Sequence, residues 1–178
     1  STAEEVILRE RTANWQHFTF IDTAGCGLQK KVKKQTLSTY NEEEASLLIK
    51  YLGQNLLIDE TIGIIAPYKA QTEFLRELLK QDQAFDHVRE QVTINSVDAF
   101  QGQERDVICI SLTRSNDRGE IGFLKEYRRM NVAMTRARTR LIIIGDSATL
   151  VEDAFYSRVI DYVQRLGGYK SAFELLYE

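Results

Sequence analysis

Cysteine, proline and long apolar runs are scarce in this sequence, and each scarcity excludes a class of protein. The two cysteines in 178 residues, Cys26 and Cys109, lack the spacing of metal ligands, so neither a disulfide scaffold nor a cysteine-based zinc module fits. No apolar run approaches the roughly 18 residues of a membrane helix, and the acidic start STAEEVILRE has no signal-peptide pattern. We therefore expect a reduced, soluble, cytoplasmic protein without a membrane partner.

An excess of one charge is also lacking. The formal net charge is −3, with 43% hydrophobic and 28% charged residues, which is typical of a globular protein rather than a disordered one. Any nucleic acid that binds must therefore meet a local basic patch. The sole proline, Pro67, and the lack of repeats or linker-like tracts predict one domain that spans residues 1–178.

The sequence does contain an alternation of apolar runs and amphipathic segments. Asn41, followed by three glutamates, has the pattern of a helix cap with carboxylates in the first turn. Residues 68–80 and 128–138 repeat apolar side chains at helical spacing. Continuous apolar strands between helices predict a mainly parallel sheet covered on both faces, a three-layer α/β/α domain. The predicted strands cover residues 18–25, 61–67, 92–95, 106–112 and 141–146, and the closing helices cover 154–166 and 171–176.

A polar segment, SVDAFQGQERD at residues 96–106, separates the third and fourth strands. In open α/β sheets, ligands bind at loops that leave the carboxyl ends of the strands, so the segment lies where such a sheet builds its site. Ser96 and the amides after it can donate to a phosphate, and Asp98 and Gln101 can orient sugars, bases or neighbouring side chains. The alternative is a capped turn, with Ser96 or Asp98 at the cap and Phe100 packed inward.

The second half of this segment contains Gly102 and Glu104. Gly102 allows the backbone to turn tightly or to approach a ligand closely. Glu104 can accept hydrogen bonds from a ribose hydroxyl or hold an arginine. Both residues suit a nucleotide site as well as an ordinary turn.

Residues 125–140, KEYRRMNVAMTRARTR, concentrate positive charge against a single acid, Glu126. Arg129 and Arg136 are seven residues apart and share one face of the predicted helix, where a planar guanidinium can bind two phosphate oxygens at once. The alternative is a solvated basic face without a ligand. The cations are Lys125, Arg128, Arg129, Arg136, Arg138 and Arg140, and an apolar stripe predicted to face the core consists of Met130, Met134 and Ala137.

Two other features carry weaker signals. Pro67 and Tyr68 follow a strand and can offer a stacking face for a base, although a tyrosine half-buried under a helix start gives the same pattern. Cys26 lies in DTAGCG, which is not the glycine fingerprint of a dinucleotide site, and no histidine is placed near it to activate a nucleophile.

Four stretches occur in a fitting order: IGIIAPYKAQ, SVDAFQGQERDVICIS, RSNDRGEIGFLKEYRRMNVAMTRAR and GDS. Together they resemble motifs IV, V and VI of superfamily 1 helicases, and more narrowly the 5′→3′ branch that includes the nonsense-mediated decay helicase and the immunoglobulin mu-binding helicase. The resemblance covers the chain from about residue 20 to its end, and QGQE at this separation from NVAMTRAR is a specific signal. It implies the second domain of a RecA-like P-loop NTPase fold, which uses ATP with Mg²⁺ and binds single-stranded DNA or RNA.

The resemblance also implies roles for individual residues. Arg136 of TRAR matches the arginine that reaches the γ-phosphate, and Gly102 and Glu104 match residues that link the nucleotide to the nucleic acid. An arginine that enters from a neighbouring domain neutralises charge on the transferred phosphoryl group when the domains close. The positions that match the nucleic-acid side are Pro67, Tyr68, Ser96, Val97, Asp98 and Gln101.

Two elements of such helicases are missing. The sequence contains neither a GxxxxGK[ST] phosphate loop nor the family's Asp-Glu box. We therefore interpret residues 1–178 as the excised C-terminal half of a motor whose N-terminal RecA-like domain holds the Mg²⁺ ligands, and we expect this half alone to be inactive. Two alternatives stay open: a non-catalytic α/β module that binds single-stranded nucleic acid without ATP, and a small-molecule enzyme that uses Cys26 or a dinucleotide.

Overall fold

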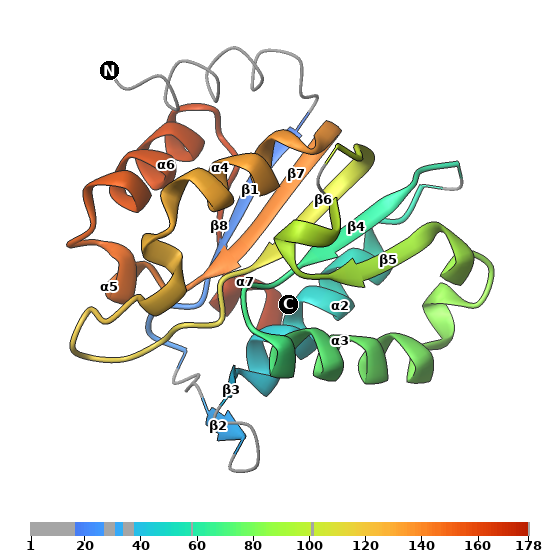
Figure 1. Cartoon of the computed structure of the whole chain (residues 1–178), viewed down its shortest axis with the longest axis horizontal. Helices are drawn as coiled ribbons and strands as arrows, with labels where there is room; N and C mark the ends of the chain where they lie inside the picture. Colours follow the sequence, from blue (N-terminus) through green and yellow to red (C-terminus); the bar gives the residue numbers. More distant parts are fainter. Residues whose placement is uncertain (1–16, 27–30, 34–37, 58, 101, 178) are drawn as a thin grey trace.

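A six-stranded parallel sheet in the order β5-β4-β6-β7-β1-β8 forms the centre of the fold (Figure 1). The computed structural model describes residues 17–26, 31–33, 38–57, 59–100 and 102–177. Apolar runs that are buried from end to end, such as IGII in β4, account for a sheet covered on both faces. The strands are β1 (His17–Asp22), β4 (Ile62–Ile65), β5 (Val92–Asn95), β6 (Arg105–Ser111), β7 (Ala137–Gly145) and β8 (Tyr169–Ser171).

Helices pack on both faces of this sheet, with α4 and α6 on one side and α2 and α3 on the other (Figure 1). Successive residues of β7 serve the two sides: Leu141 belongs to the apolar cluster under α4 and α6, and Ile142 to the cluster under α2 and α3. Within the described residues, no helix combines the length and the apolar character needed to cross a bilayer. The helices are α2 (Glu42–Gln54), α3 (Lys69–Gln81), α4 (Tyr127–Thr135), α5 (Ser147–Leu150), α6 (Ala154–Arg165) and α7 (Ala172–Tyr177), with short 3₁₀ turns η1 (Gln83–Phe85), η2 (Arg89–Gln91), η3 (Val97–Phe100) and η4 (Gly122–Lys125).

The predicted three-layer α/β/α architecture and all five predicted strands are confirmed. Asn41 caps α2 as expected, since its side chain accepts a hydrogen bond from the amide of Glu44 at 3.1 Å. The helix predicted over 128–138 is wrong at its end. It stops at Thr135, because Ala137 already pairs with Arg105 at the start of β7.

Three short strands were missed. An antiparallel pair, β2 (Lys31–Lys33) and β3 (Ser38–Tyr40), lies outside the predicted strands. Strand β8 extends the main sheet beside β1. It follows Gly168, where a Cβ would lie 1.7 Å from the carbonyl oxygen of Phe18, so glycine permits the close approach. These strands have three residues each, too short for an apolar period to reveal them.

The segment 96–106 crosses the sheet rather than staying at one edge. Because β4 lies between β5 and β6, the chain passes over β4 on its way from one strand to the other. Gly63 of β4 leaves room for this crossing: a Cβ there would lie 2.8 Å from the ring of Phe100 and 2.8 Å from Cδ1 of Ile108. Phe100 is thereby buried against the sheet. The capped-turn alternative predicted this inward packing.

Replacing Gly63 by alanine is expected to destabilise the fold by about 1–3 kcal/mol, because the added methyl group overpacks the site under Phe100. For a domain of this size the corresponding fall in Tm is about 2–4 °C per kcal/mol, measurable by calorimetry. Adding Ile108→Val removes one of the two clashing atoms and is expected to recover part of the loss. An unchanged Tm for the single variant would contradict the packing of Phe100 on Gly63.

Candidate functional site

The segment 96–106 joins the carboxyl-terminal ends of the parallel strands, termed the carboxyl edge, to their amino-terminal ends, termed the amino edge. It begins where β5 ends, at the carboxyl edge, and finishes where β6 begins, at the amino edge. The expectation that the whole segment lies at the carboxyl edge is therefore wrong for Gly102 and Glu104. The physical reason is that consecutive parallel strands both start at the amino-terminal end of the sheet. The chain must therefore return from the end of one strand to the start of the next, and here it does so across the face of the sheet without a long helix.

At the carboxyl edge, the structure brings the ends of β4 and β5 together around a small pocket of about 80 Å³. Four residues that the sequence assigns to nucleic acid lie in its wall: Pro67, Ser96, Val97 and Asp98. Ser96 and Asp98 are exposed, whereas the side chain of Val97 is buried and leaves mainly its backbone at the surface. Gln101 lies outside the described residues. The remaining wall consists of Phe123, Glu126, Arg129 and Met130.

Asp98 positions Arg129 above this pocket. The carboxylate of Asp98 lies 2.8 Å from the guanidinium of Arg129, and Glu126 lies 3.0 Å from the same group. All three side chains are about half exposed, so the ion pairs are screened by water and contribute little to stability. Arg129 can thus exchange these carboxylates for another anion.

Tyr68 is not an open stacking face. It is only 6% exposed, because it begins α3 beneath the turn η4. Its hydroxyl oxygen accepts a hydrogen bond from the amide of Phe123, and the two rings lie 5.3 Å apart between their centroids. The exposed aromatic side chain in the pocket wall is Phe123, which sequence reasoning missed. Its position seven residues before Met130 in the GEIGFL loop carried no periodic signal.

At the amino edge, the structure places Gly102, Glu104 and Arg136 together. The amide of Arg105 donates to the carbonyl oxygen of Arg136 at 3.0 Å, so the end of segment 96–106 is joined directly to the residue that ends α4. Gly102 has a φ of +73°, a left-handed conformation that favours glycine, and the space beside it is open. Glu104 is exposed.

Arg136 is half-buried and directed by its own helix. Its Nε donates to the carbonyl oxygen of Val132 at 3.3 Å, one turn earlier in α4. Among the described residues, no carboxylate lies within ion-pair distance of its guanidinium. The remaining nitrogens are thus available to an anion that approaches the amino edge.

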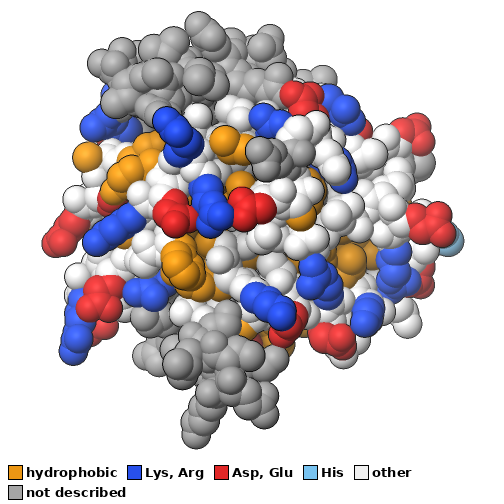
Figure 2. Space-filling view, viewed as in Figure 1, with side chains coloured by type: hydrophobic (Ala, Val, Ile, Leu, Met, Phe, Trp, Pro, Cys, Tyr) orange, Lys and Arg blue, Asp and Glu red, His pale blue; other side chains and the backbone are white. Residues whose placement is uncertain are grey.

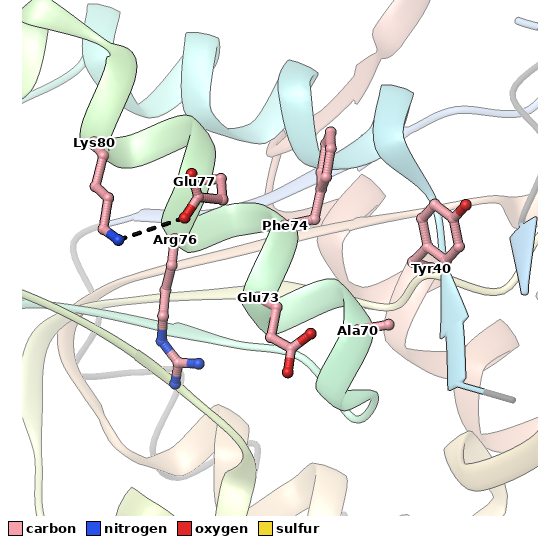
Figure 3. Close-up of a pocket in the computed structure, with 7 residues that line it drawn as sticks. All are labelled: Tyr40, Ala70, Glu73, Phe74, Arg76, Glu77 and Lys80. Carbon is pink, nitrogen blue, oxygen red and sulfur yellow. Dashed lines mark hydrogen bonds and ion pairs between the residues drawn. The ribbon is translucent and has the colours of Figure 1, made fainter. Parts of the chain in front are cut away.

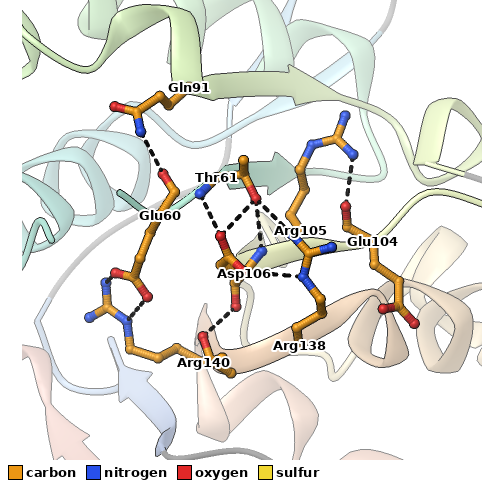
Figure 4. Close-up of polar contacts among 9 residues, drawn as sticks. Glu60, Thr61, Gln91, Glu104, Arg105, Asp106, Arg138 and Arg140 are labelled. Carbon is orange, nitrogen blue, oxygen red and sulfur yellow. Dashed lines mark hydrogen bonds and ion pairs between the residues drawn. The ribbon is translucent and has the colours of Figure 1, made fainter. Parts of the chain in front are cut away.

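The other arginines of this strand start are engaged, as Figure 4 shows. Arg138 contacts Asp106 at 3.1 Å, and Arg140 contacts Glu60 at 2.6 Å in a largely buried pair. Asp106 sits opposite a bulge, since Arg105 pairs with Ala137 but Val107 pairs with Arg140. The amide of Thr61, followed by Arg138, lowers the pKa of Asp106 below its ordinary value, which keeps it ionised to hold this corner of the sheet.

The dense positive charge of residues 125–140 is therefore partly neutralised in the folded chain. Arg129, Arg138 and Arg140 each meet acids from distant parts of the sequence. Figure 2 shows blue and red side chains interspersed over the face that α4 covers, without one continuous basic field. The three members of the predicted apolar stripe are buried, but only Met130 and Met134 lie on α4, since Ala137 begins β7. Arg129 and Arg136 lie at opposite ends of α4, one toward each edge of the sheet.

A second polar cluster was missed altogether. Glu44, predicted only as a carboxylate in the first turn of a helix, is completely buried, and its Oε1 accepts hydrogen bonds from Ser111 at 2.6 Å and the amide of Thr113 at 2.7 Å. Its Oε2 has no partner among the described residues. Burial above all raises the pKa of Glu44 to about 7. Thr113 has a φ of +74°, an uncommon left-handed conformation that this hydrogen bond helps to hold.

The thiols show no sign of activation. Burial, followed by the negative charges of Asp22 and Asp146, raises the pKa of Cys26 above its ordinary value, which disfavours a nucleophilic thiolate. Cys109 is fully buried in β6, and its pKa is raised to about 12. The described residues also contain no group of three or more His, Cys, Asp or Glu side chains that could hold a metal ion.

A wider hollow of about 500 Å³ lies elsewhere, along the outer side of α3 and beside Tyr40 of β3 (Figure 3). Its charged side chains already have partners within the fold: Lys80 pairs with Glu77, and Arg76 donates to the carbonyl oxygen of Ile94 at 2.6 Å. None of the residues that the sequence assigns to a site lines it. The candidate site therefore remains the two edges that segment 96–106 connects.

Comparisons with known proteins point to the same family as the sequence motifs. The profile of a family described as "AAA domain" matches residues 2–148. The rat "DNA-binding protein SMUBP-2" is 38% identical over 161 residues, which cover 88% of this chain and 16% of that protein. The "DNA polymerase alpha-associated DNA helicase A" of Saccharomyces cerevisiae is 40% identical over 135 residues, which cover 72% of this chain and 19% of that protein.

Among solved structures, the C-terminal domain of a possible DNA helicase from Lactobacillus plantarum WCFS1 superimposes with a TM-score of 0.54 over 97% of each chain. At 13% sequence identity this likeness shows the fold alone. The chain spans less than a fifth of the length of either curated relative.

Proposed function

The chain belongs to the AAA domain family of superfamily 1 helicases, and from that premise we propose that it is the second motor domain of an ATP-dependent DNA or RNA helicase. Residues 1–178 then form a single RecA-like domain, the C-terminal half of the motor. It supplies the arginine that meets the γ-phosphate and half of the surface that holds a single strand. Hydrolysis on one side is thereby coupled to movement of the strand on the other.

One observation carries this proposal: a single segment of the chain connects the two candidate surfaces. Segment 96–106 contributes Ser96 and Asp98 to the carboxyl edge, then crosses the sheet and contributes Glu104 to the amino edge beside Arg136. Phe100 anchors the crossing against Gly63, so the two ends move as parts of one packed element. A displacement of the amino edge is therefore transmitted to the pocket at the carboxyl edge.

On the nucleotide side, the proposed ligand is ATP with Mg²⁺, shared with an N-terminal RecA-like domain of the same protein. Arg136 fits the phosphate end, because its guanidinium has no carboxylate partner among the described residues and reaches two oxygens at once. Gly102 and Glu104 flank it. The Mg²⁺ ligands are assigned to the partner domain, since residues 1–178 contain neither the GxxxxGK[ST] phosphate loop nor the Asp-Glu box.

On the strand side, the proposed contacts are the residues around the small pocket at the carboxyl edge. Ser96 and the backbone beside Val97 can donate to phosphate oxygens, and Asp98 controls whether Arg129 is free to do so. Pro67 and Gln101 are assigned to the same surface. Tyr68 contributes from beneath, as the support of Phe123.

The experiment joins this chain to its N-terminal partner domain and titrates a labelled single strand by filter binding or anisotropy. We expect the affinity to differ by at least about tenfold between the ATP-analogue and ADP states, because closure of the nucleotide cleft repositions segment 96–106. The 178-residue chain alone is expected to show no measurable ATP turnover. An affinity that is equal in all nucleotide states would instead indicate a passive module that binds single strands without ATP.

A further inference from the structure

Phe123 is an exposed aromatic side chain that the core does not use. It lies in the turn η4, and 57% of its surface is accessible, although the neighbouring Ile121 and Leu124 are buried. Exposing a large aromatic ring to water has a cost of about 25 cal/mol for each Å² of apolar surface. The ring is open to water beside the proposed strand surface, where it can contact a ligand.

The loop that presents Phe123 is held in one conformation. Asn116 closes it by accepting hydrogen bonds from the amides of Arg118 and Glu120 and by donating to the carbonyl oxygen of Glu120 at 2.8 Å. Arg114 donates to the same carbonyl oxygen at 3.1 Å. The ring is thus presented on a preorganised loop, which lowers the entropy lost when a ligand binds.

Tyr68 fixes the ring from below. Its hydroxyl oxygen accepts a hydrogen bond from the amide of Phe123 at 3.3 Å, and the ring centroids lie 5.3 Å apart with the planes tilted by 38°. Gly122 has a φ of +53°, and a Cβ there would lie 2.6 Å from the same hydroxyl oxygen. A glycine is therefore required for the loop to approach Tyr68 so closely. Because Tyr68 packs on the buried side of Phe123, a second flat group can stack on its solvent side.

The surroundings of the ring suit a polymer of bases and phosphates. Phe123 shares the wall of the pocket with Ser96, Asp98 and Arg129, and the pocket volume of about 80 Å³ is far below the roughly 300 Å³ of sites that enclose a small molecule. A ligand therefore rests on the rim rather than inside. Lys125, in the same turn, and Arg128 are exposed cations that can meet the phosphates beside a stacked base.

We propose that Phe123 is a stacking platform for one unstacked base of a single-stranded nucleic acid, with Tyr68 as its buried support. The inference rests on the proposed function and adds a subsite to it. The base stacks on the open face of Phe123, and Arg129 leaves Asp98 to bind the adjoining phosphate. Because every base has a π-face, the contact tolerates any sequence.

The test measures the affinity of a fluorescein-labelled oligothymidylate for the full-length protein by anisotropy, in the nucleotide state that binds more tightly. Phe123→Ala and Phe123→Leu are both expected to weaken binding by on the order of 10-fold, because leucine restores apolar volume but not a π-face. Phe123→Trp is expected to stay within about twofold of the parent. Phe173→Ala is the matched control, since Phe173 is 55% exposed on α7 at the opposite face of the sheet, and its removal is expected to leave binding unchanged.

A strand that carries abasic nucleotides isolates the stacking contribution. The parent protein is expected to bind this strand more weakly than oligothymidylate, and Phe123→Ala is expected to discriminate less between the two strands. If Phe123→Leu retains the parent affinity, or if the abasic strand shows the same ratio for both proteins, the ring does not stack on a base. A docking site for another protein would then explain its exposure.

The same preparations separate this inference from the proposed function. If affinity still depends on the nucleotide state while the Phe123 variants bind like the parent, the stacking subsite is rejected and the motor assignment stands. If the parent protein binds no single strand in any nucleotide state, both are rejected.

Discussion

Replacing Arg136 by alanine is expected to reduce ATP turnover by about 10³- to 10⁵-fold in the protein that joins this chain to its N-terminal partner domain. In the proposed role, the guanidinium neutralises charge that spreads over the γ-phosphate oxygens in the transition state. At the same edge, Arg138 and Arg140 are held by carboxylates, and Arg105 donates to Gln103 and to the carbonyl oxygen of Glu104. The measurement is steady-state phosphate release stimulated by single-stranded nucleic acid. Arg136→Lys is expected to recover little, because an ammonium group cannot bind two oxygens in one plane.

The control for this prediction is Arg128→Ala. Arg128 lies on the same helix and is exposed, but it is in the first turn, toward the carboxyl edge, so its removal is expected to leave basal phosphate release, measured without nucleic acid, within about twofold. Arg136→Ala is also expected to leave single-strand affinity unchanged when no nucleotide is present. Turnover that survives the loss of Arg136 would remove the residue from the nucleotide site.

Replacing Glu44 by glutamine is expected to abolish most of the pH dependence of stability between pH 4.5 and 8. The folded chain raises the pKa of Glu44 from its ordinary value of 4.5 to about 7, mainly through burial. The folded state then binds this proton more tightly than the unfolded state, so the contribution of Glu44 to stability is largest below pH 4.5 and is lost as the pH rises through 7. Each pKa unit is worth about 1.4 kcal/mol, so ionising Glu44 costs the folded state on the order of 3 kcal/mol.

Urea unfolding at a series of pH values measures this effect. Glutamine keeps an oxygen that can accept from Ser111 and from the amide of Thr113, but it has no charge to desolvate at any pH. Glu43→Gln is the matched control, because Glu43 is an exposed neighbour in the same turn and its loss is expected to leave the pH profile unchanged. Equal pH profiles for the parent and for Glu44→Gln would show that Glu44 does not titrate in this range.

The elements that the sequence revealed are those with a local signal. Strand β5 was predicted with its correct ends, because its first three residues, Val92, Thr93 and Ile94, are β-branched and polar residues flank them. The cap at Asn41 was also read correctly, since capping involves an amide only three residues away. The end of α4 was not, because the pairing of Ala137 with Arg105 overrides the helical period of MTRAR.

The candidate site was predictable as a set of residues and not as a geometry. The motifs pointed to Arg136, Glu104 and Asp98, but the linear order gave no reason to place the first two at one edge and the third at the other. Phe123 carried no pattern at all, since its exposure is a consequence of Tyr68 and Gly122 packing beneath it. A side chain that is exposed by its neighbours cannot be recognised before those neighbours are known.

By itself, the sequence determined the three-layer class, the order of the strands along the chain and the residues of the motifs, because hydrophobic periods and caps act within a few residues. Only the tertiary structure decided which charges remain open. Arg138 meets Asp106 from 32 positions away, and Glu44 meets Ser111 from 67 positions away. Electrostatic interactions and burial depend on distance in space rather than on separation along the chain. Cations that read as one basic stretch therefore become structural ion pairs at Arg138 and Arg140, whereas Arg136 at the same edge has no carboxylate partner among the described residues.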